Sequence, residues 1–195
     1  MNIYLASKSP RRQSLLKQIG IDFDCINSEI DETLLDDEPP LDYVKRMATE
    51  KALAGWANEG RLVEKPLLAA DTSVVLGSHV LGKPQNIEDA INMLKTLSGN
   101  THQVITCVTV KSEFEQKTIT SITDVTFGQL SDSAINEYVK TGDCFDKAGS
   151  YGIQGLAAKF ISSISGSYSG VVGLPLFETS KLLEQFNDEP KTRTS

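Results

Sequence analysis

The chain has 195 residues, 39% of them hydrophobic, which suits one domain, or two lobes around one cleft, with a sizeable core. Its net charge of -7 argues against a general affinity for DNA, RNA or anionic membranes, because these partners require a broad basic surface. No apolar run reaches the length of a membrane span and no signal-peptide pattern is present, so we expect a cytoplasmic protein. Cys25, Cys107 and Cys144 include no C-x-x-C pair and are expected to be buried, reduced thiols.

The first segment, "IYLASKSPRR", predicts a short buried strand followed by a helix. Ser9 is the expected N-cap, and the proline after it suits the first helical position. Arg11 and Arg12 then fall in the first helical turn, where the helix dipole favours acidic side chains. Two cations at this position predict a nearby anion.

The stretch "DFDCINSEIDETLLDDEPP", residues 22–40, is predicted to be an acidic loop, either a metal site or simply solvated. A helix is expected over residues 40–57. Lys51 lies on the apolar stripe of that helix, where an aliphatic residue is typical. A lysine covering apolar surface with its methylene groups is the alternative interpretation.

Asp71 lies within the apolar run "PLLAADTSVVL", which is expected to form a buried strand. A carboxylate in this position must be paired, bound to a metal or protonated, because burying a lone charge is very costly. An aspartate that caps a neighbouring loop is the alternative. A turn and a short return strand carrying Lys83 follow, and then a helix with Asn86 as its N-cap.

The second half of the chain predicts two long strands, a capped helix, a glycine-rich loop, a further strand with a turn, and a last helix. These elements are expected at residues 102–110, 118–127, 131–142, 146–155, 157–175 and 175–186. His79 and His102 are expected at the surface or in loops. The mixture of strands and helices without strict alternation predicts an α/β protein with a mixed, twisted sheet flanked by helices. A single domain is expected over residues 1–187, with a disordered tail at 188–195.

The cations and acids that stand at unexpected positions in this sequence are explained by one kind of ligand. Phosphate accounts for the cations, and a divalent metal between phosphate and carboxylate accounts for the acids. No P-loop motif and no dinucleotide fingerprint is present, and neither histidine lies in a recognisable nucleophile context. The residues concerned are Arg11, Arg12, Lys51, Lys83, Glu32 and Asp71.

Eight sequence blocks resemble, in order and spacing, the Maf family of nucleoside triphosphate pyrophosphatases. They are "ASKSPRR", "DE" at 31 and 32, "YVKRMATEKA", "AADTSVV", "LGKP", "LSGNTHQVIT", "DKAGSYGIQG" and "GSYSGVVGLPL". The resemblance implies an inosine-triphosphatase-like fold with two lobes around a cleft and dependence on a divalent metal, Mg or Mn. It also implies cleavage of a nucleoside triphosphate to the monophosphate and pyrophosphate, a house-cleaning role, by a cytoplasmic homodimer.

The resemblance also separates branches of the family. The 7-methyl-GTP branch has a tryptophan after the proline of the first motif, a glutamine after the catalytic aspartate, and a Lys-Ser-Glu-like sequence in the glycine-rich loop. This chain has Arg11, Thr72 and Gln154 at the three branch-specific positions, as in the branch that acts on dTTP and UTP. Thr72 and Gln154 are expected to read the pyrimidine, because a buried amide can pair with both a carbonyl and the ring N–H.

The resemblance assigns Asp71 as the proton acceptor and Glu32 as a second acidic residue, both of them metal ligands. The residues expected to bind the phosphates are Ser7, Arg11, Arg12, Lys51 and Lys83. A non-catalytic nucleotide sensor that regulates cell division or septum formation stays open as an alternative.

Overall fold

The computed structural model describes residues 1–187, so the tail expected at 188–195 lies outside the described residues. Most of the expected helices and strands are present. The elements are β1 (Asn2–Ala6), α1 (Pro10–Gln18), β2 (Asp22–Cys25), α2 (Pro40–Trp56), β3 (Leu67–Leu76), β4 (His79–Leu81), α3 (Ile87–Leu97), β5 (Thr101–Lys111), β6 (Gln116–Phe127), α4 (Asp132–Lys140), the 3-10 turns η1 (Ala148–Ser150) and η2 (Leu156–Phe160), β7 (Ile161–Ser165), α5 (Tyr168–Val172) and α6 (Leu176–Asn187).

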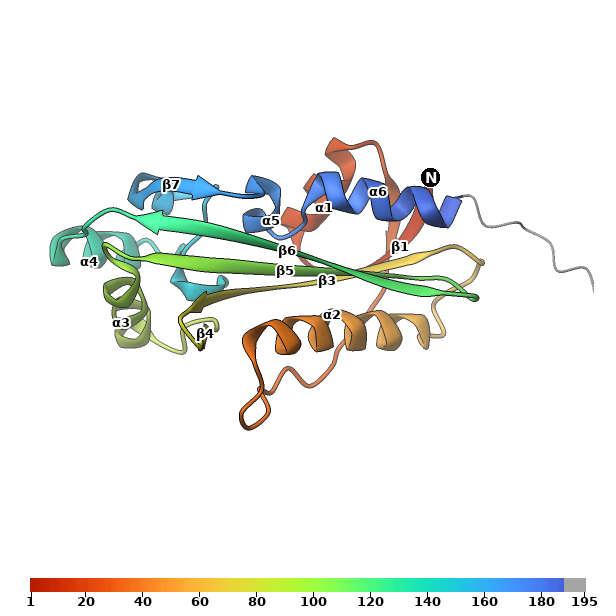
Figure 1. Cartoon of the computed structure of the whole chain (residues 1–195), viewed down its shortest axis with the longest axis horizontal. Helices are drawn as coiled ribbons and strands as arrows, with labels where there is room; N and C mark the ends of the chain where they lie inside the picture. Colours follow the sequence, from red (N-terminus) through yellow and green to blue (C-terminus); the bar gives the residue numbers. More distant parts are fainter. Residues whose placement is uncertain (188–195) are drawn as a thin grey trace, which may run out of the picture.

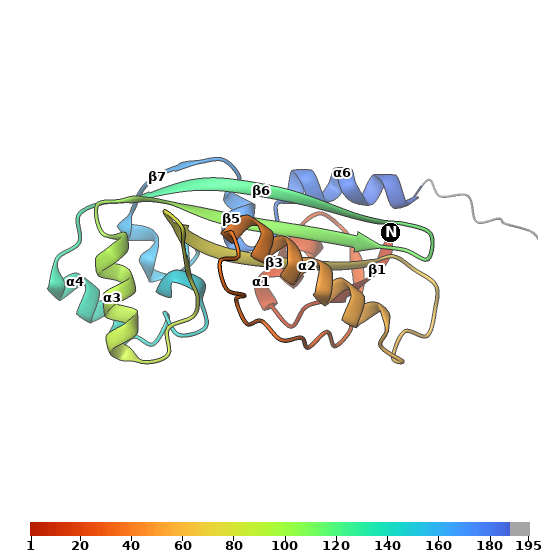
Figure 2. The same cartoon turned by 60° about the horizontal axis from the view of Figure 1, so that its bottom comes forward.

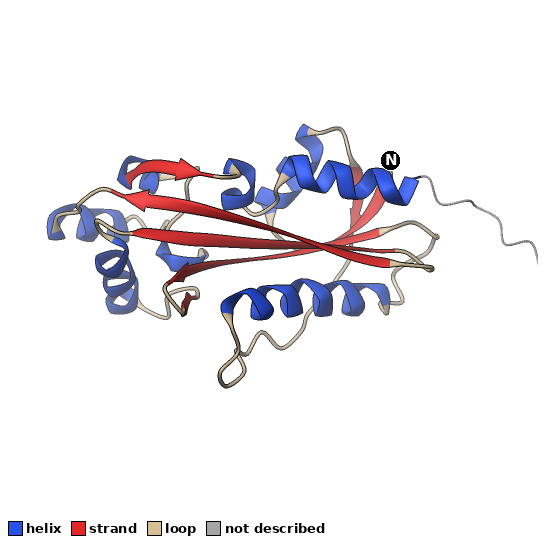
Figure 3. Ribbon diagram, viewed as in Figure 1, coloured by secondary structure: helices blue, strands red, loops and turns tan. Residues whose placement is uncertain are grey.

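Within residues 1–187, the strands form one seven-stranded mixed sheet, in the order β2-β1-β3-β5-β6-β7 with β4 attached to β3. Figure 3 shows the strands in red and the flanking helices in blue. β1 pairs in parallel with β2 and β3, whereas the pairs made by β4, β5, β6 and β7 are antiparallel. The expected mixed sheet flanked by helices is therefore confirmed.

Helices cover both faces of this sheet, with α2 on one face and α1, α5 and α6 on the other (Figure 1). Side chains along β3 alternate between the two faces. Leu67 and Ala69 pack with Ala52 of α2. Leu68 and Ala70 pack into the cluster that includes α1 and α6. Consecutive residues of β3 therefore serve different layers of the protein.

The molecule has two lobes, and the long strands β3, β5 and β6 extend through both of them (Figures 1 and 2). β3 contributes Leu68 to the core next to α1 and α6, and Val74 to the core next to α3 and α4. β5 does the same with Val110 and Val104. The two cores are thus built on the same strands.

Two regions contain more regular structure than the sequence predicts. β2 lies in the predicted acidic loop; its side chains are exposed or half-buried, so it lacks the apolar alternation of a typical strand. The segment 157–175 contains η2 and α5 in addition to the expected strand. Only five residues long, α5 is too short for a helical periodicity to show in the sequence.

Two predictions about the cysteines and histidines are wrong. Cys25 is exposed, whereas Cys107 and Cys144 are buried as expected. His102 is buried, and its Nε2 lies 2.7 Å from the hydroxyl oxygen of Tyr151. Burial lowers the pKa of His102 to about 4, so this histidine is neutral at physiological pH.

Candidate active site

The candidate site lies at a gap in the sheet. β1 ends at Ala6, and β4 begins to pair with β3 only at Val74. Between these points, residues 70–73 of β3 pair only with β5 among the described strands. A pocket of about 750 Å³ opens at this gap, a volume typical of small-molecule sites. Because an uncovered strand edge can be reached from both faces of the sheet, Asp71 and Thr72 line the same pocket.

Lys51 joins the two predicted acidic residues. Its Nζ lies 2.7 Å from Asp71 Oδ1 and 2.7 Å from Glu32 Oε1. The side chains of Lys51 and Asp71 are only 14% and 11% exposed. The sequence left open whether Asp71 is paired, metal-bound or protonated, and the structure shows it paired with Lys51. Lys51 itself lines the pocket with its ammonium group and does not merely cover apolar surface.

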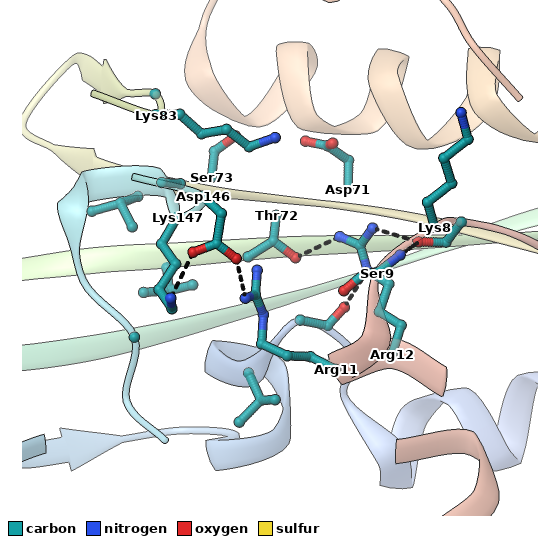
Figure 4. Close-up of a pocket in the computed structure, with 18 of the residues that line it drawn as sticks. Lys8, Ser9, Arg11, Arg12, Asp71, Thr72, Ser73, Lys83, Asp146 and Lys147 are labelled. Atoms are coloured by element: carbon teal, nitrogen blue, oxygen red, sulfur yellow. Dashed lines mark hydrogen bonds and ion pairs between the residues drawn. The ribbon is translucent and has the colours of Figure 1, made fainter. Parts of the chain in front are cut away.

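Cations outweigh burial in the electrostatics of Glu32. Burial raises the pKa of this carboxyl, but the bond with Lys51 and the charges of Lys51, Lys83 and Arg12 lower it below its ordinary value. Lys83 is exposed, and it forms no ion pair within residues 1–187. The side chains of Lys83 and Asp71 point toward one another in Figure 4. The ammonium group of Lys83 thus has no fixed partner among residues 1–187.

Arg12 is held on three sides. Its Nε donates to the Gly173 carbonyl at 2.9 Å, Nη2 donates to Thr72 Oγ1 at 3.1 Å, and Nη1 donates to Ser7 Oγ at 3.4 Å. Burial lowers the pKa of Arg12, and the charge of Asp71 partly offsets this effect. The predicted substrate residue Ser7 therefore contacts Arg12 in the pocket wall.

The first turn of α1 faces the pocket with free backbone donors. Ser9 occupies the N-cap position, as expected, but its side chain forms no cap hydrogen bond within residues 1–187. Its backbone N–H donates to Ser7 Oγ at 3.2 Å. The first helical bond runs from the Gln13 N–H to the Ser9 carbonyl, which leaves the N–H groups of Arg11 and Arg12 without helical acceptors.

Arg11 is paired with the glycine-rich loop and does not stand alone. Its Nη1 lies 3.1 Å from Asp146 Oδ2, and Lys147 Nζ lies 2.6 Å from Asp146 Oδ1 (Figure 4). Burial raises the pKa of Asp146, but its bonds with Lys147 and Arg11 lower it below the ordinary value. A Cβ at Gly152 would come within 2.6 Å of the Lys147 side chain, so the glycine gives this lysine room.

The two residues expected to read a base differ in their surroundings. The Thr72 hydroxyl contacts Arg12 and, at 2.9 Å, the hydroxyl of Thr106. Gln154 lines the pocket, but it is exposed and its amide has no hydrogen-bond partner in the described part of the chain. A buried amide at this position is therefore a wrong prediction.

The family model for Maf-like proteins matches residues 2–186. The chain belongs to the Maf family. A "dTTP/UTP pyrophosphatase" of Pseudoalteromonas atlantica is 52% identical over 95% of this chain and 97% of that protein. A "dTTP/UTP pyrophosphatase" of Chromobacterium violaceum is 48% identical over 96% of both. The solved structure of the Staphylococcus aureus Ham1 protein is 16% identical, with a TM-score of 0.41, over 65% of this chain and 72% of that chain.

The sequence analysis missed three polar residues of this Maf pocket. The Tyr43 hydroxyl donates to the Glu32 carbonyl oxygen at 3.0 Å, and burial together with Asp71 and Glu32 raises the pKa of Tyr43 to about 12. Its position on the helix expected over residues 40–57 gave no signal, because tyrosine is common on amphipathic helices. Asp146 and Lys147 were visible only as part of the motif "DKAGSYGIQG".

The Maf chain has a partial set of metal-binding side chains at this site. Within residues 1–187, no three side chains of His, Cys, Asp or Glu gather closely enough to form a metal site by themselves. Asp71 and Glu32 nevertheless converge on one point, where Lys51 Nζ lies. Mg²⁺ typically uses one or two carboxylates and completes its shell with water and substrate phosphate oxygens. The two carboxylates fit such a cation.

Proposed function

We propose that this chain is a nucleoside triphosphate pyrophosphatase that hydrolyses dTTP and UTP to the monophosphate and pyrophosphate. The observation that carries the proposal is the gap in the sheet, where Arg12, Lys51 and Lys83 surround the paired carboxylates of Asp71 and Glu32. The extent of the match to relatives named dTTP/UTP pyrophosphatase supports the same activity. The enzyme would act as a hydrolase in nucleotide metabolism.

The proposed reaction begins with a water molecule that attacks the α-phosphorus. The bond between this phosphorus and the oxygen that bridges to the β-phosphorus breaks, and pyrophosphate leaves with both bonding electrons. Asp71 accepts the proton of the attacking water and later releases it to solvent. Asp71 Oδ1 is bonded to Lys51, whereas Oδ2 has no hydrogen bond within residues 1–187, which leaves one oxygen for the water.

The cations and the start of α1 bind the triphosphate in this proposal. Arg12 and Lys83 have donors to spare, and the free N–H groups of the first turn of α1 suit an anion. Arg11 and Lys51 reach phosphate by exchanging Asp146 and Glu32, respectively, for phosphate oxygens.

We assign Asp71 and Glu32 as the residues that would hold Mg²⁺ or Mn²⁺. The convergence of both carboxylates on a cation, the Lys51 ammonium, supports this assignment. When bound, such a metal supplies neutralisation of the phosphate charge. Tyr43 holds the backbone of Glu32 in place through its hydroxyl group.

Arg11 and Gln154 are proposed to set the preference for dTTP and UTP, whereas the hydroxyl group of Thr72, which the resemblance also assigns to base recognition, is bonded to Arg12. The amide of Gln154 can donate to a carbonyl and accept from the N–H of uracil or thymine. Its lack of a protein partner within residues 1–187 supports this role. Arg11 lines the same pocket and donates a hydrogen bond to Asp146 of the glycine-rich loop.

The decisive experiment measures pyrophosphate release from dTTP, UTP, CTP, ATP and GTP by purified protein with Mg²⁺ or Mn²⁺. We expect release from dTTP and UTP, and an Asp71→Asn variant that folds normally but turns over at least about 10²-fold more slowly, because it lacks the proton acceptor. Slow turnover that Asp71→Asn leaves unchanged would instead support the nucleotide-sensing regulator of cell division.

We also propose a single domain over residues 1–187 and a cytoplasmic homodimer. The continuity of β3, β5 and β6 through both lobes supports the single domain. No described helix is both long enough and apolar enough to cross a membrane. The net charge of -7 supports free nucleotides over nucleic acid as substrates.

A further inference from the structure

A chain of hydrogen bonds connects helix α5 to Arg12 through the sheet. Thr72 of β3 and Thr106 of β5 are directly opposite each other, and their hydroxyl oxygens lie 2.9 Å apart. Thr106 Oγ1 lies 2.8 Å from the Gly170 carbonyl oxygen of α5. Thr72 Oγ1 accepts from Arg12 Nη2 at 3.1 Å. We call this set of groups the threonine relay: the hydroxyls of Thr72 and Thr106 and the carbonyl of Gly170.

The ends of the threonine relay determine where its protons lie. A carbonyl oxygen only accepts, so the single hydroxyl proton of Thr106 goes to Gly170. A guanidinium only donates, so Thr72 accepts from Arg12. The proton of Thr72 must then go to Thr106. As a result, Thr72 has no proton to donate to a carbonyl oxygen of a nucleobase.

The same helix end also holds Arg12 directly. Arg12 Nε donates to the carbonyl of Gly173, the C-cap of α5, and Nη1 donates to Ser7. Three of the five N–H donors of Arg12 are therefore engaged, which leaves two for a phosphate. Burying a polar group is costly unless the group is hydrogen-bonded, so loss of one hydroxyl group leaves its partners in the relay without a bond.

We propose that Thr106 is a positioning residue for Arg12, and that Thr72 acts through the same relay instead of contacting the base. The inference rests on the proposed function, because it takes Arg12 as a phosphate-binding group. Thr106 is fully buried and does not line the pocket. A substitution at this position therefore changes the hold on Arg12 without touching a bound nucleotide.

Three variants separate positioning from a merely structural role. Thr106→Val keeps the shape and removes the hydroxyl group, whereas Thr106→Ser keeps the hydroxyl group. Thr109→Val is the matched control: Thr109 is also buried on β5, and its hydroxyl lies 2.8 Å from that of Thr118 and is not connected to Arg12. If Thr106→Val does not fold, Thr72→Val breaks the same relay one link nearer to Arg12.

The affinity for inorganic tripolyphosphate is measured by calorimetry, and kcat/KM is measured for dTTP, UTP and CTP. Thr106→Val is expected to lose about three- to tenfold in both quantities, equally for the three nucleotides, because the hydroxyl that bonds both Gly170 and Thr72 is lost and Thr72 then orients Arg12 less well. Thr106→Ser and Thr109→Val are expected to stay within about twofold of the parent. An unchanged Thr106→Val, an equal loss in Thr109→Val or a changed ratio of dTTP to CTP would overturn the inference.

The two readouts distinguish this inference from the proposed function. A parent protein that binds tripolyphosphate but releases no pyrophosphate from any nucleotide contradicts the proposed function, and the affinities still test the relay. A parent that hydrolyses dTTP while Thr106→Val keeps full affinity and activity contradicts the relay alone.

Discussion

Replacement of Lys51 by Met is expected to destabilise the protein, because Lys51 neutralises a nearly buried carboxylate. Lys51 Nζ lies 2.7 Å from Asp71 Oδ1, and the two side chains are only 14% and 11% exposed. Met keeps most of the aliphatic volume of lysine. It leaves Asp71 close to Glu32 without the positive charge that lies between them.

The structure sets the size of the expected loss. Removing one partner of a buried ion pair typically costs about 3–5 kcal/mol. Arg12 still attracts Asp71 in the variant, and Glu32, with 54% of its side chain exposed, is partly solvated. We therefore expect the lower end, about 3 kcal/mol in the free energy of unfolding. In a protein of this size the loss corresponds to a Tm lower by about 6–12 °C.

Urea unfolding at pH 7, followed by circular dichroism, measures this loss. EDTA is included so that no divalent cation takes the place of the lysine ammonium. Lys8→Met is the control: the Lys8–Glu29 contact is equally short at 2.6 Å, but both side chains are 75% exposed. Its loss should be much smaller, because water already screens the pair. Equal losses in the two variants would refute the argument that burial determines the value of the Lys51 contact.

Three further predictions concern activity and pH. Lys83→Ala should lower kcat/KM for dTTP by about 10- to 100-fold, because a charge-assisted bond to a phosphate is lost. Its Tm should be unchanged, because this exposed lysine has no ion pair within residues 1–187. A large drop in Tm would contradict this prediction. Gln154→Glu should reduce dTTP cleavage at least about tenfold, since the donor amide is lost, without altering the stability measured by urea unfolding. Cleavage of dTTP at the rate of the parent would show that Gln154 does not recognise the base. The depressed pKa of Glu32 stabilises the folded state above the ordinary glutamate pKa of 4.5, and this contribution is lost as the pH falls through the lower folded value. Urea stability measured from pH 7 downwards should therefore fall more steeply below about pH 4.5 in the parent than in Glu32→Gln, and parallel curves would contradict this.

Local signals in the sequence were sufficient for most of the fold. Asn86 and Ser131 cap α3 and α4 through their side chains, as expected from their positions before apolar periodic segments. Asp71 was noticeable because a carboxylate interrupts an apolar run, and the cost of burying a lone charge requires it to be paired, bound to a metal or protonated; that its partner is Lys51, 20 positions away, was not predicted. Both inferences depend on residues within a few positions of each other.

Long-range partners could not be predicted in this way. Arg11 is 135 positions from Asp146, and no local pattern shows that the first helix meets the glycine-rich loop. The same holds for His102, which lies at a polar strand end but packs between Phe127 and Tyr151. Gln154 was expected to be a buried amide because the family resemblance assigns it to base recognition, although burial depends on the path of the whole loop.

The three strands that pass through both lobes also determine how the cleft can move. β3, β5 and β6 have 10, 11 and 12 residues, and their mutual hydrogen bonds run beside the pocket without a linker between the lobes. A hinge needs a few residues free to change their backbone angles, whereas bending here would strain three paired strands at once. The cleft therefore has a nearly constant width. Adjustment to nucleotides of different size has to come from the loops at its rim, the acidic loop that carries Glu32 and the glycine-rich loop that carries Gln154.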